Sequence, residues 1–168
     1  MPKIDNKTFY STAIEKYGIT AKGVNWHSKE SQKLRFDIIL DMLPRDLSIY
    51  TIADAGCGFG DLYLYMLKKK RAPKEYIGID SLEEMYAIAL NNTGCEVVVA
   101  DICTDALPSA DFYVCSGAMN VLESFETHLF VQNCFSSCRV RYIIVHVILL
   151  RDDYMDDDIT VMFLKESI

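Results

Sequence analysis

The pattern of apolar and polar positions changes near residue 49. Ahead of it, Leu34, Ile38 and Met42 recur at helical spacing, which predicts a helix over residues 28–43 with Ser28 as its N-cap. Another helix is predicted at residues 7–17. Beyond residue 49, short apolar runs alternate with helical segments. The predicted strands are 49–53, 76–79, 96–100, 112–115, 140–150 and 159–165, and the predicted helices between them are 61–70, 82–91 and 122–138.

This alternation predicts right-handed βαβ units and an α/β, Rossmann-like, doubly wound, mostly parallel sheet with helices on both faces. The C-terminal region is too short for another crossover helix, which needs about a dozen residues. The last two strands are therefore expected to form a C-terminal antiparallel hairpin that turns at residues 152–158. The expected strand order is 3-2-1-4-5, followed by the antiparallel strand.

The length of 168 residues favours a single compact domain. Within it we expect an N-terminal helical lid at residues 1–46 and a ligand-binding domain at residues 47–168. The net charge of −7 argues against stable nucleic-acid binding, which usually needs a basic surface. The longest apolar run, residues 142–150, is too short to span a bilayer, and no signal peptide is seen. We therefore expect a cytoplasmic protein without membrane contact.

The six cysteines contain no Cys-x-x-Cys pair, and most lie in apolar runs, which predicts reduced, buried thiols. Cys134 and Cys138 are one helical turn apart but lack a second ligand pair for zinc. The acidic run DDYMDDD lacks the glycine and the terminal glutamate of an EF-hand loop. The sequence predicts no metal site.

The stretch DAGCGFGD, residues 54–61, follows the first predicted strand and carries Gly56, Gly58 and Gly60. Such loops often cradle phosphates, but here Asp54 and Asp61 flank the glycines and would repel them. A ligand with a cationic end fits better. S-adenosylmethionine (SAM) has an ammonium and a sulfonium, and glycines allow close approach of its methionyl part. The alternative interpretation is a glycine turn that serves only tight strand–helix packing.

Further acids follow the next strands at corresponding places. Asp80, followed by Ser81 and Leu82, ends the second strand and is positioned to accept ribose hydroxyls. At the end of the third strand, the Asp101 carboxylate can accept the adenine amino group while the amide of Ile102 reaches a ring nitrogen. The fourth strand runs into small residues, including Ser116 and Gly117, that leave room beside a reacting methyl group.

On these residues, the sequence resembles class I SAM-dependent methyltransferases over roughly residues 20–168. DAGCGFGD is similar to their first motif, YIGID to their second-strand acid, VVADI to their adenine turn and DFYVCSGAMNV to their fourth-strand motif. The resemblance implies a sheet of seven strands in the order 3-2-1-4-5-7-6. This chain is shortened relative to it, because one strand and one helix are missing.

The upstream stretch GVNWHSKESQKLRF is similar to the leading helix of small bacterial and archaeal methyltransferases of undefined substrate. That resemblance implies that Trp26, Gln32 and Arg35 lie beside the cofactor. Arg35 is then expected to pair with the methionyl carboxylate. The alternatives are a surface salt bridge for Arg35 and a core position for Trp26.

The predicted function is a SAM-dependent methyltransferase that acts on an unidentified small-molecule acceptor. No catalytic residue is singled out, and no oligomeric state is predicted. The absence of Asp/Asn-Pro-Pro-Tyr/Phe after the fourth strand disfavours methylation of nucleic-acid bases. The alternatives are a SAM-binding module without turnover and a nucleotide-dependent oxidoreductase. The candidate acceptor-side residues are Tyr10, Tyr17, His27, Met119 and Asn120.

Overall fold

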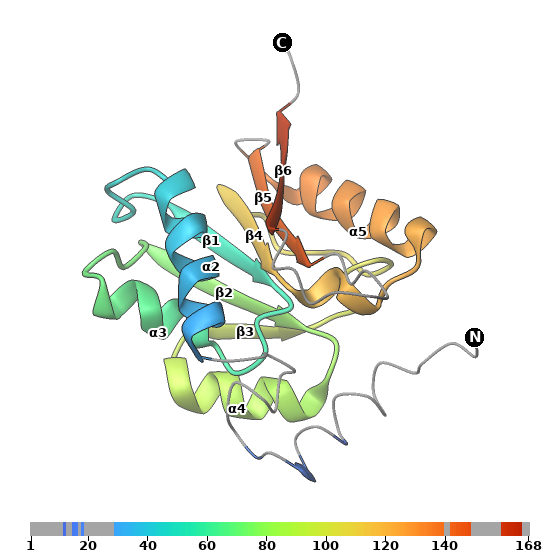
Figure 1. Ribbon diagram of the computed structural model, residues 1–168, viewed down its shortest axis with the longest axis horizontal. Helices are drawn as coiled ribbons and strands as arrows, with labels where there is room; N and C mark the ends of the chain where they lie inside the picture. The colour runs from blue at the N-terminus through green and yellow to red at the C-terminus, as the bar shows by residue number, and fades with distance from the viewer. Residues whose placement is uncertain are drawn as a thin grey trace.

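The computed structural model describes residues 12, 15, 16, 18, 29–139, 142–148 and 159–165. The described helices are α2 (Lys29–Met42), α3 (Asp61–Lys68), α4 (Glu83–Thr93) and α5 (Ser124–Ser137), with a 3₁₀ helix η2 (Ala118–Val121). The strands are β1 (Thr51–Ala55), β2 (Glu75–Asp80), β3 (Glu96–Val99), β4 (Phe112–Ser116), β5 (Tyr142–Ile148) and β6 (Ile159–Lys165). Figure 1 shows the strands as one twisted sheet between the helices.

The six strands lie in the order β3-β2-β1-β4-β5-β6. The first five are parallel, and β6 runs antiparallel to β5. This order confirms the Rossmann-like α/β fold predicted from the alternation of apolar runs and helices. The turn predicted at residues 152–158 lies outside the described residues. The helix η2, which follows β4, was not predicted.

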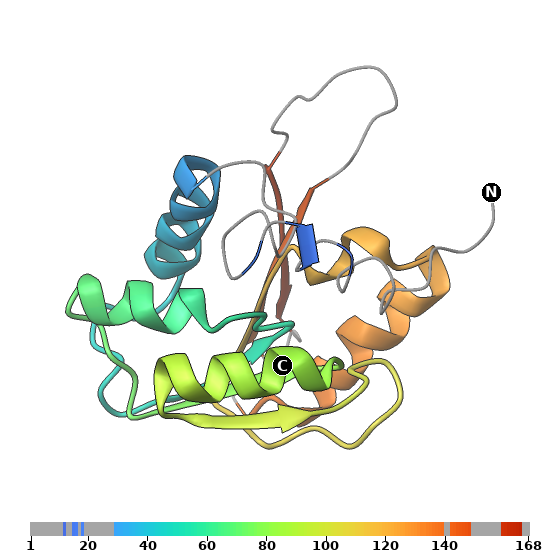
Figure 2. The ribbon, with the colours of Figure 1, turned by 90° about the horizontal axis from the view of Figure 1, so that it is seen from below.

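Helices lie on both sides of the sheet (Figure 2), and alternate residues of β1 and β4 pack toward opposite layers. Ile52, Phe112 and Val114 pack with the apolar faces of α2 and α3. The cluster under α5 contains Ala53, Ala55, Ile77, Ile79, Tyr113 and Cys115. Helix α4 lies on the α3 side, because its Ala89 packs with Cys57 of the loop before α3. The sheet is therefore covered on both faces, as expected for a doubly wound fold.

The first strand lies two residues later than predicted. Ile49 is 66 % exposed and lies in a turn, whereas all five residues Thr51–Ala55 are buried. The prediction of 49–53 was wrong because it counted the apolar Ile49 as a strand residue and assigned the charged Asp54 and the adjacent Ala55 to the loop. The correction places Asp54 inside a buried strand instead of in the loop that follows it.

Helix α2 is part of the core, although it belongs to the segment predicted as a lid. Its Ile39 is fully buried against β1 and α3. Arg71, after α3, donates hydrogen bonds to the carbonyls of Leu40, Leu43 and Pro44 at 2.7, 3.2 and 2.7 Å. These carbonyls close the C-terminus of α2, so the arginine caps that helix and ties it to α3.

Candidate functional site

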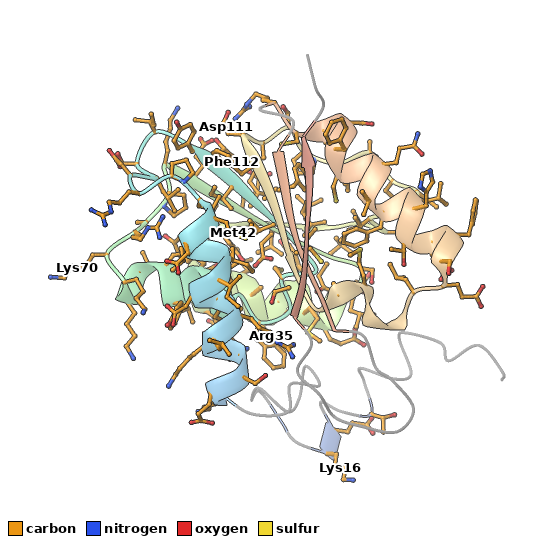
Figure 3. The ribbon with its side chains drawn as sticks, turned by 45° about the horizontal axis from the view of Figure 1, so that its top comes forward. Lys16, Arg35, Met42, Lys70, Asp111 and Phe112 are labelled. Atoms are coloured by element: carbon orange, nitrogen blue, oxygen red, sulfur yellow. The ribbon has the colours of Figure 1, made fainter. Side chains whose placement is uncertain are left out.

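The loops after β1, β2, β3 and β4 meet at the edge of the sheet where the parallel strands end, which is where ligands bind in open α/β sheets. Figure 3 shows Arg35 of α2 toward this end of the molecule, while Asp111 and Phe112, at the start of β4, lie at the opposite end. The predicted site residues in these loops are therefore brought to one edge.

Gly56, Gly58 and Gly60 all have left-handed backbones, with φ of 80°, 54° and 80°. A Cβ atom at Gly56 would lie 2.1 Å from Cβ of Ala118, and one at Gly60 would lie 2.4 Å from Cγ2 of Thr93. Both approaches are far inside van der Waals contact. Two of the three glycines are therefore required by packing of the chain against itself, as the alternative interpretation of this loop proposed.

The amides of the glycine loop are turned inward. Those of Gly56 and Cys57 donate to the carbonyl of Ile79 at 2.8 and 3.0 Å, and that of Gly60 donates to Cys57 at 2.9 Å. The amide of Gly58 donates to Oδ2 of Asp80 at 3.0 Å. These four donors are satisfied by the protein, so the loop does not present them as a nest for a phosphate group.

Asp80 joins the first loop to the second. Its Oδ2 accepts from Gly58, and its Oδ1 accepts from the amide of Leu82 at 3.1 Å. Burial raises the pKa of Asp80, and the backbone hydrogen bonds partly oppose this effect. Leu82 itself is buried with Phe59, whereas Ser81 is exposed. The predicted second-strand acid therefore lies at the glycine loop.

Asp54 is only 3 % exposed. Its Oδ2 accepts a hydrogen bond from the hydroxyl of Tyr76 on β2, at 2.6 Å. Burial raises the pKa of Asp54 to about 7; the Tyr76 hydrogen bond opposes this rise, and the charges of Asp80 and Asp61 add to it. Asp80 and Asp61 are therefore close enough for their charges to act on Asp54 beside the glycine loop.

The third of these acids, Asp61, is the first residue of α3 and is held from α2. The side-chain amide of Gln32 donates to Oδ2 of Asp61 at 3.0 Å. Gln32 and Arg35, one helical turn apart, are 8 % and 4 % exposed. Two of the three residues predicted upstream of the first strand therefore come from a buried face of α2. Trp26, like Tyr10, Tyr17 and His27, lies outside the described residues.

The turn after β3 is exposed at Asp101 and buried at Ile102. Oδ1 of Asp101 accepts from the amide of Cys103 at 2.9 Å, which fixes the carboxylate next to the chain. From α5, the side chain of Asn133 donates to the carbonyls of Ile102 and Asp105, both at 2.8 Å. Asn133 therefore fixes the predicted adenine turn, a role that the sequence analysis missed.

The loop after β4 carries the remaining predicted positions. Gly117 has a left-handed backbone with φ of 83°, and Oγ of Ser116 is buried with no hydrogen-bond partner among the described residues. Met119 is 3 % exposed and packs in the core cluster under α5. Asn120 lies in η2, and its side chain is outside what the structure describes. The structure thus places Met119 in the core and Ser116 at the edge.

Tyr76 is the other site residue that the sequence analysis missed. Strand alternation could have found it, because residues 52, 54, 76 and 78 lie on one face when β1 pairs in register with β2. Gly78 on that face leaves room for Cys57, whose Sγ would lie 2.9 Å from a Cβ atom there.

Within the part of the chain that the structure describes, no three acidic, cysteine or histidine side chains could hold a metal ion, and no helix is long and apolar enough to cross a membrane.

Solved structures with this fold include magnesium protoporphyrin IX methyltransferase from Synechocystis PCC 6803 with bound SAM. It has a TM-score of 0.64 and 16 % identity, over 94 % of this chain and 83 % of that one. SAM-bound CalS10, an amino pentose methyltransferase from Micromonospora echinaspora, has a TM-score of 0.58 and 20 % identity, over 88 % of this chain and 59 % of that one. Human N-acetylserotonin methyltransferase in complex with SAM has a TM-score of 0.55 and 19 % identity, over 86 % of this chain and 46 % of that one.

At these identities the structures show the shared fold. Several of them are much longer than this chain, which spans about half to four fifths of the three compared above. No curated protein gives a significant match. A family model described as "Methyltransferase domain" matches residues 52–140, just over half of the chain, from β1 to the end of α5. The chain belongs to this methyltransferase-domain family.

Proposed function

We propose that the protein is a SAM-dependent methyltransferase that acts on a small-molecule acceptor. The observation that carries the proposal is the glycine loop, in which four backbone amides are satisfied internally and three carboxyl groups gather around them. A dinucleotide needs free loop amides for its pyrophosphate and would meet these acids, so an oxidoreductase is disfavoured. A cofactor with a cationic methionyl end and no phosphate suits the same loop.

The residues present fit SAM. A carboxylate offers about four lone-pair positions, and we assign those of Asp80 that the backbone does not use to the ribose hydroxyls. Asp101 uses Oδ1 for Cys103, and we assign its other oxygen to the adenine amino group, with the amide of Ile102 toward the ring. Gln32 and Arg35 are assigned to the methionyl end, which Asp54 and Asp61 favour through its ammonium.

SAM, when bound, supplies a methyl group on a sulfonium that is already a good leaving group. The work of the chain is therefore to hold and orient donor and acceptor. We assign the loop after β4, with Ser116 and Gly117, to the side that faces the methyl group. Met119 packs in the core and receives no acceptor contact in this assignment. The acceptors named for two of the structural neighbours, a protoporphyrin and an amino pentose, are small molecules, which supports a small acceptor here.

Titration calorimetry with SAM, S-adenosylhomocysteine and NAD tests the cofactor. We expect binding of the first two and none of NAD. Binding of NAD, or no binding of SAM by the folded protein, contradicts the proposal. Turnover is tested with methyl-labelled SAM and the small-molecule fraction of a cell extract. Label transfer is expected; SAM binding with no transfer would favour a binding module without turnover.

A further inference from the structure

Tyr76 and Asp54 form a buried pair, and Asp54 lies directly before the glycine loop. They lie on neighbouring strands, β2 and β1, and are 3 % exposed each. The tyrosine hydroxyl donates to Oδ2 of the aspartate at 2.6 Å, which is a short, charge-assisted geometry. The ring of Tyr63 on α3 packs on that of Tyr76, with centroids 4.8 Å apart. The hydroxyl is therefore fixed in place by packing from α3 and by its strand.

The groups around Asp54 oppose its charge. Asp80 on β2 and Asp61 on α3 are acids whose charges disfavour its ionised form. Burial raises the pKa of the thiols of Cys57, in the loop, and Cys115, on β4, and the charge of Asp54 raises it further. Both thiols therefore remain neutral. Burial also raises the pKa of Tyr76 well above its ordinary value, so its hydroxyl remains a donor. From α2, the polar groups on this side are Gln32, which is bound to Asp61, and the buried Arg35.

We propose that Tyr76 is a positioning residue of the cofactor site, whose hydroxyl holds the Asp54 carboxylate as an anion for the ammonium group of SAM. This inference rests on the proposed function. Of the two protonation states of Asp54, only the ionised form attracts the ammonium, and it is the form that the tyrosine hydrogen bond stabilises. At pH values below the pKa of Asp54, binding of SAM then requires the Asp54 carboxyl group to release its proton.

The test is the pH dependence of SAM affinity, measured by calorimetry from pH 5.5 to 9, in the wild type and in Tyr76→Phe. In the wild type we expect affinity to rise with pH through about 7, where Asp54 titrates. In Tyr76→Phe, Asp54 loses the hydrogen bond from the tyrosine hydroxyl, so its pKa rises. The midpoint of the pH dependence of SAM affinity therefore moves to higher pH. At pH 7 we expect the variant to bind SAM about fivefold or more weakly than the wild type, and this ratio should approach one by pH 9, because titration of the SAM amino group affects both proteins alike.

Tyr65→Phe is the matched control, because it also removes a tyrosine–aspartate hydrogen bond, from Tyr65 to Asp37 at 2.9 Å, but on the outside of α2 and α3. It should leave the pH profile unchanged. 5′-Methylthioadenosine, which lacks the amino-acid part of SAM, should bind both proteins without this pH dependence. An unchanged midpoint in folded Tyr76→Phe overturns the inference. So does a wild-type SAM affinity that is flat across this range. Failure of the wild type to bind SAM at any pH instead overturns the proposed function.

Discussion

The backbone amide of Gly58 lies 3.0 Å from Oδ2 of Asp80 and donates a hydrogen bond to it. The second strand thereby holds the loop that follows the first. One carboxylate serves both the shape of the glycine loop and, in our assignment, the ribose of the cofactor. These two roles can be separated by replacing the carboxylate in two ways.

Asp80→Ala should weaken SAM binding at least about tenfold, or 1.4 kcal/mol, because both the ribose and the loop lose an acceptor. Asp80→Asn keeps one oxygen and should retain more of the loop structure. We expect amide hydrogen exchange at Gly58 to rise in the alanine variant more than in the asparagine variant. Unchanged SAM affinity in both folded variants would remove the ribose assignment.

Gly56→Ala should destabilise the protein strongly, since its added Cβ would lie 2.1 Å from Cβ of Ala118 in a left-handed backbone. Gly94→Ala is the matched control: its φ of 65° is also left-handed, but nothing lies within 4 Å of the added atom. The control should lose about 1 kcal/mol of unfolding free energy for the backbone alone, and Gly56→Ala clearly more. Adding Ala118→Gly to Gly56→Ala should restore part of the lost free energy of unfolding, measured by urea unfolding. Equal losses in Gly56→Ala and Gly94→Ala would contradict the contact with Ala118.

Asp54→Asn should stabilise the fold at neutral and higher pH. Burial raises the pKa of Asp54 from 3.8 to about 7, so the folded state binds its proton more tightly than the unfolded state. Stability from this group is full below pH 3.8 and is lost as pH rises to about 7. Relative to the wild type, we expect the free energy of unfolding of the variant to be higher by on the order of 3 kcal/mol at pH 8, and by less at pH 5.

The measurement is urea unfolding of both proteins at the two pH values, with the exposed Asp41→Asn as the control. The same variant should bind SAM more weakly, because it cannot ionise. Gains that are equal at pH 5 and pH 8 would show that Asp54 is ionised throughout this range.

Asp101→Asn should discriminate between cofactor analogues. The variant keeps an oxygen for the amide of Cys103, while its NH₂ group replaces the oxygen that we assign to the adenine amino group. SAM should lose about 1–2 kcal/mol of binding free energy, and an analogue without the amino group should lose less. Calorimetry with both ligands measures the difference. Equal losses of binding free energy for the two ligands would show that Asp101 does not bind the adenine amino group.

Arg71→Met should lower the unfolding free energy by about 1–3 kcal/mol, because three carbonyls at and just after the end of α2 lose the hydrogen bonds that Arg71 donates. Lys68→Met, in the same basic run but exposed, should change it by less than about 0.5 kcal/mol. Thermal unfolding of the two variants provides the comparison. Similar effects would indicate that the run acts through its summed charge instead of through the cap.

Much of the fold follows from periodicity. The apolar runs and helical spacing predicted every described strand, and β6 was predicted with its observed bounds, Ile159–Lys165. The bounds of β1 were wrong because the apolar Ile49 is exposed, whereas the charged Asp54 and the adjacent Ala55 are buried. Helix η2 was missed because a single 3₁₀ turn is too short to show a period.

The site was predicted less completely, for a physical reason. Glycines and acids at strand ends are visible in one dimension, but their partners come from other elements. Tyr76 contacts Asp54 across two strands, and Asn133 reaches the adenine turn from α5. Such pairs depend on register and on crossover geometry, which a single sequence does not encode as a local pattern. The sequence therefore placed the acids at strand ends, but it missed Tyr76 and Asn133, whose contacts depend on how the elements pack.

The contact between Gly56 and Ala118 has a consequence for protein engineering. The loops after β1 and β4 meet there without a side chain of the glycine between them. Remodelling one loop to admit a bulkier acceptor would displace the loop that shapes the cofactor side, so donor and acceptor specificity are not independent design variables here. A library aimed at new acceptors should therefore leave position 118 small and vary residues on segments that do not touch position 56.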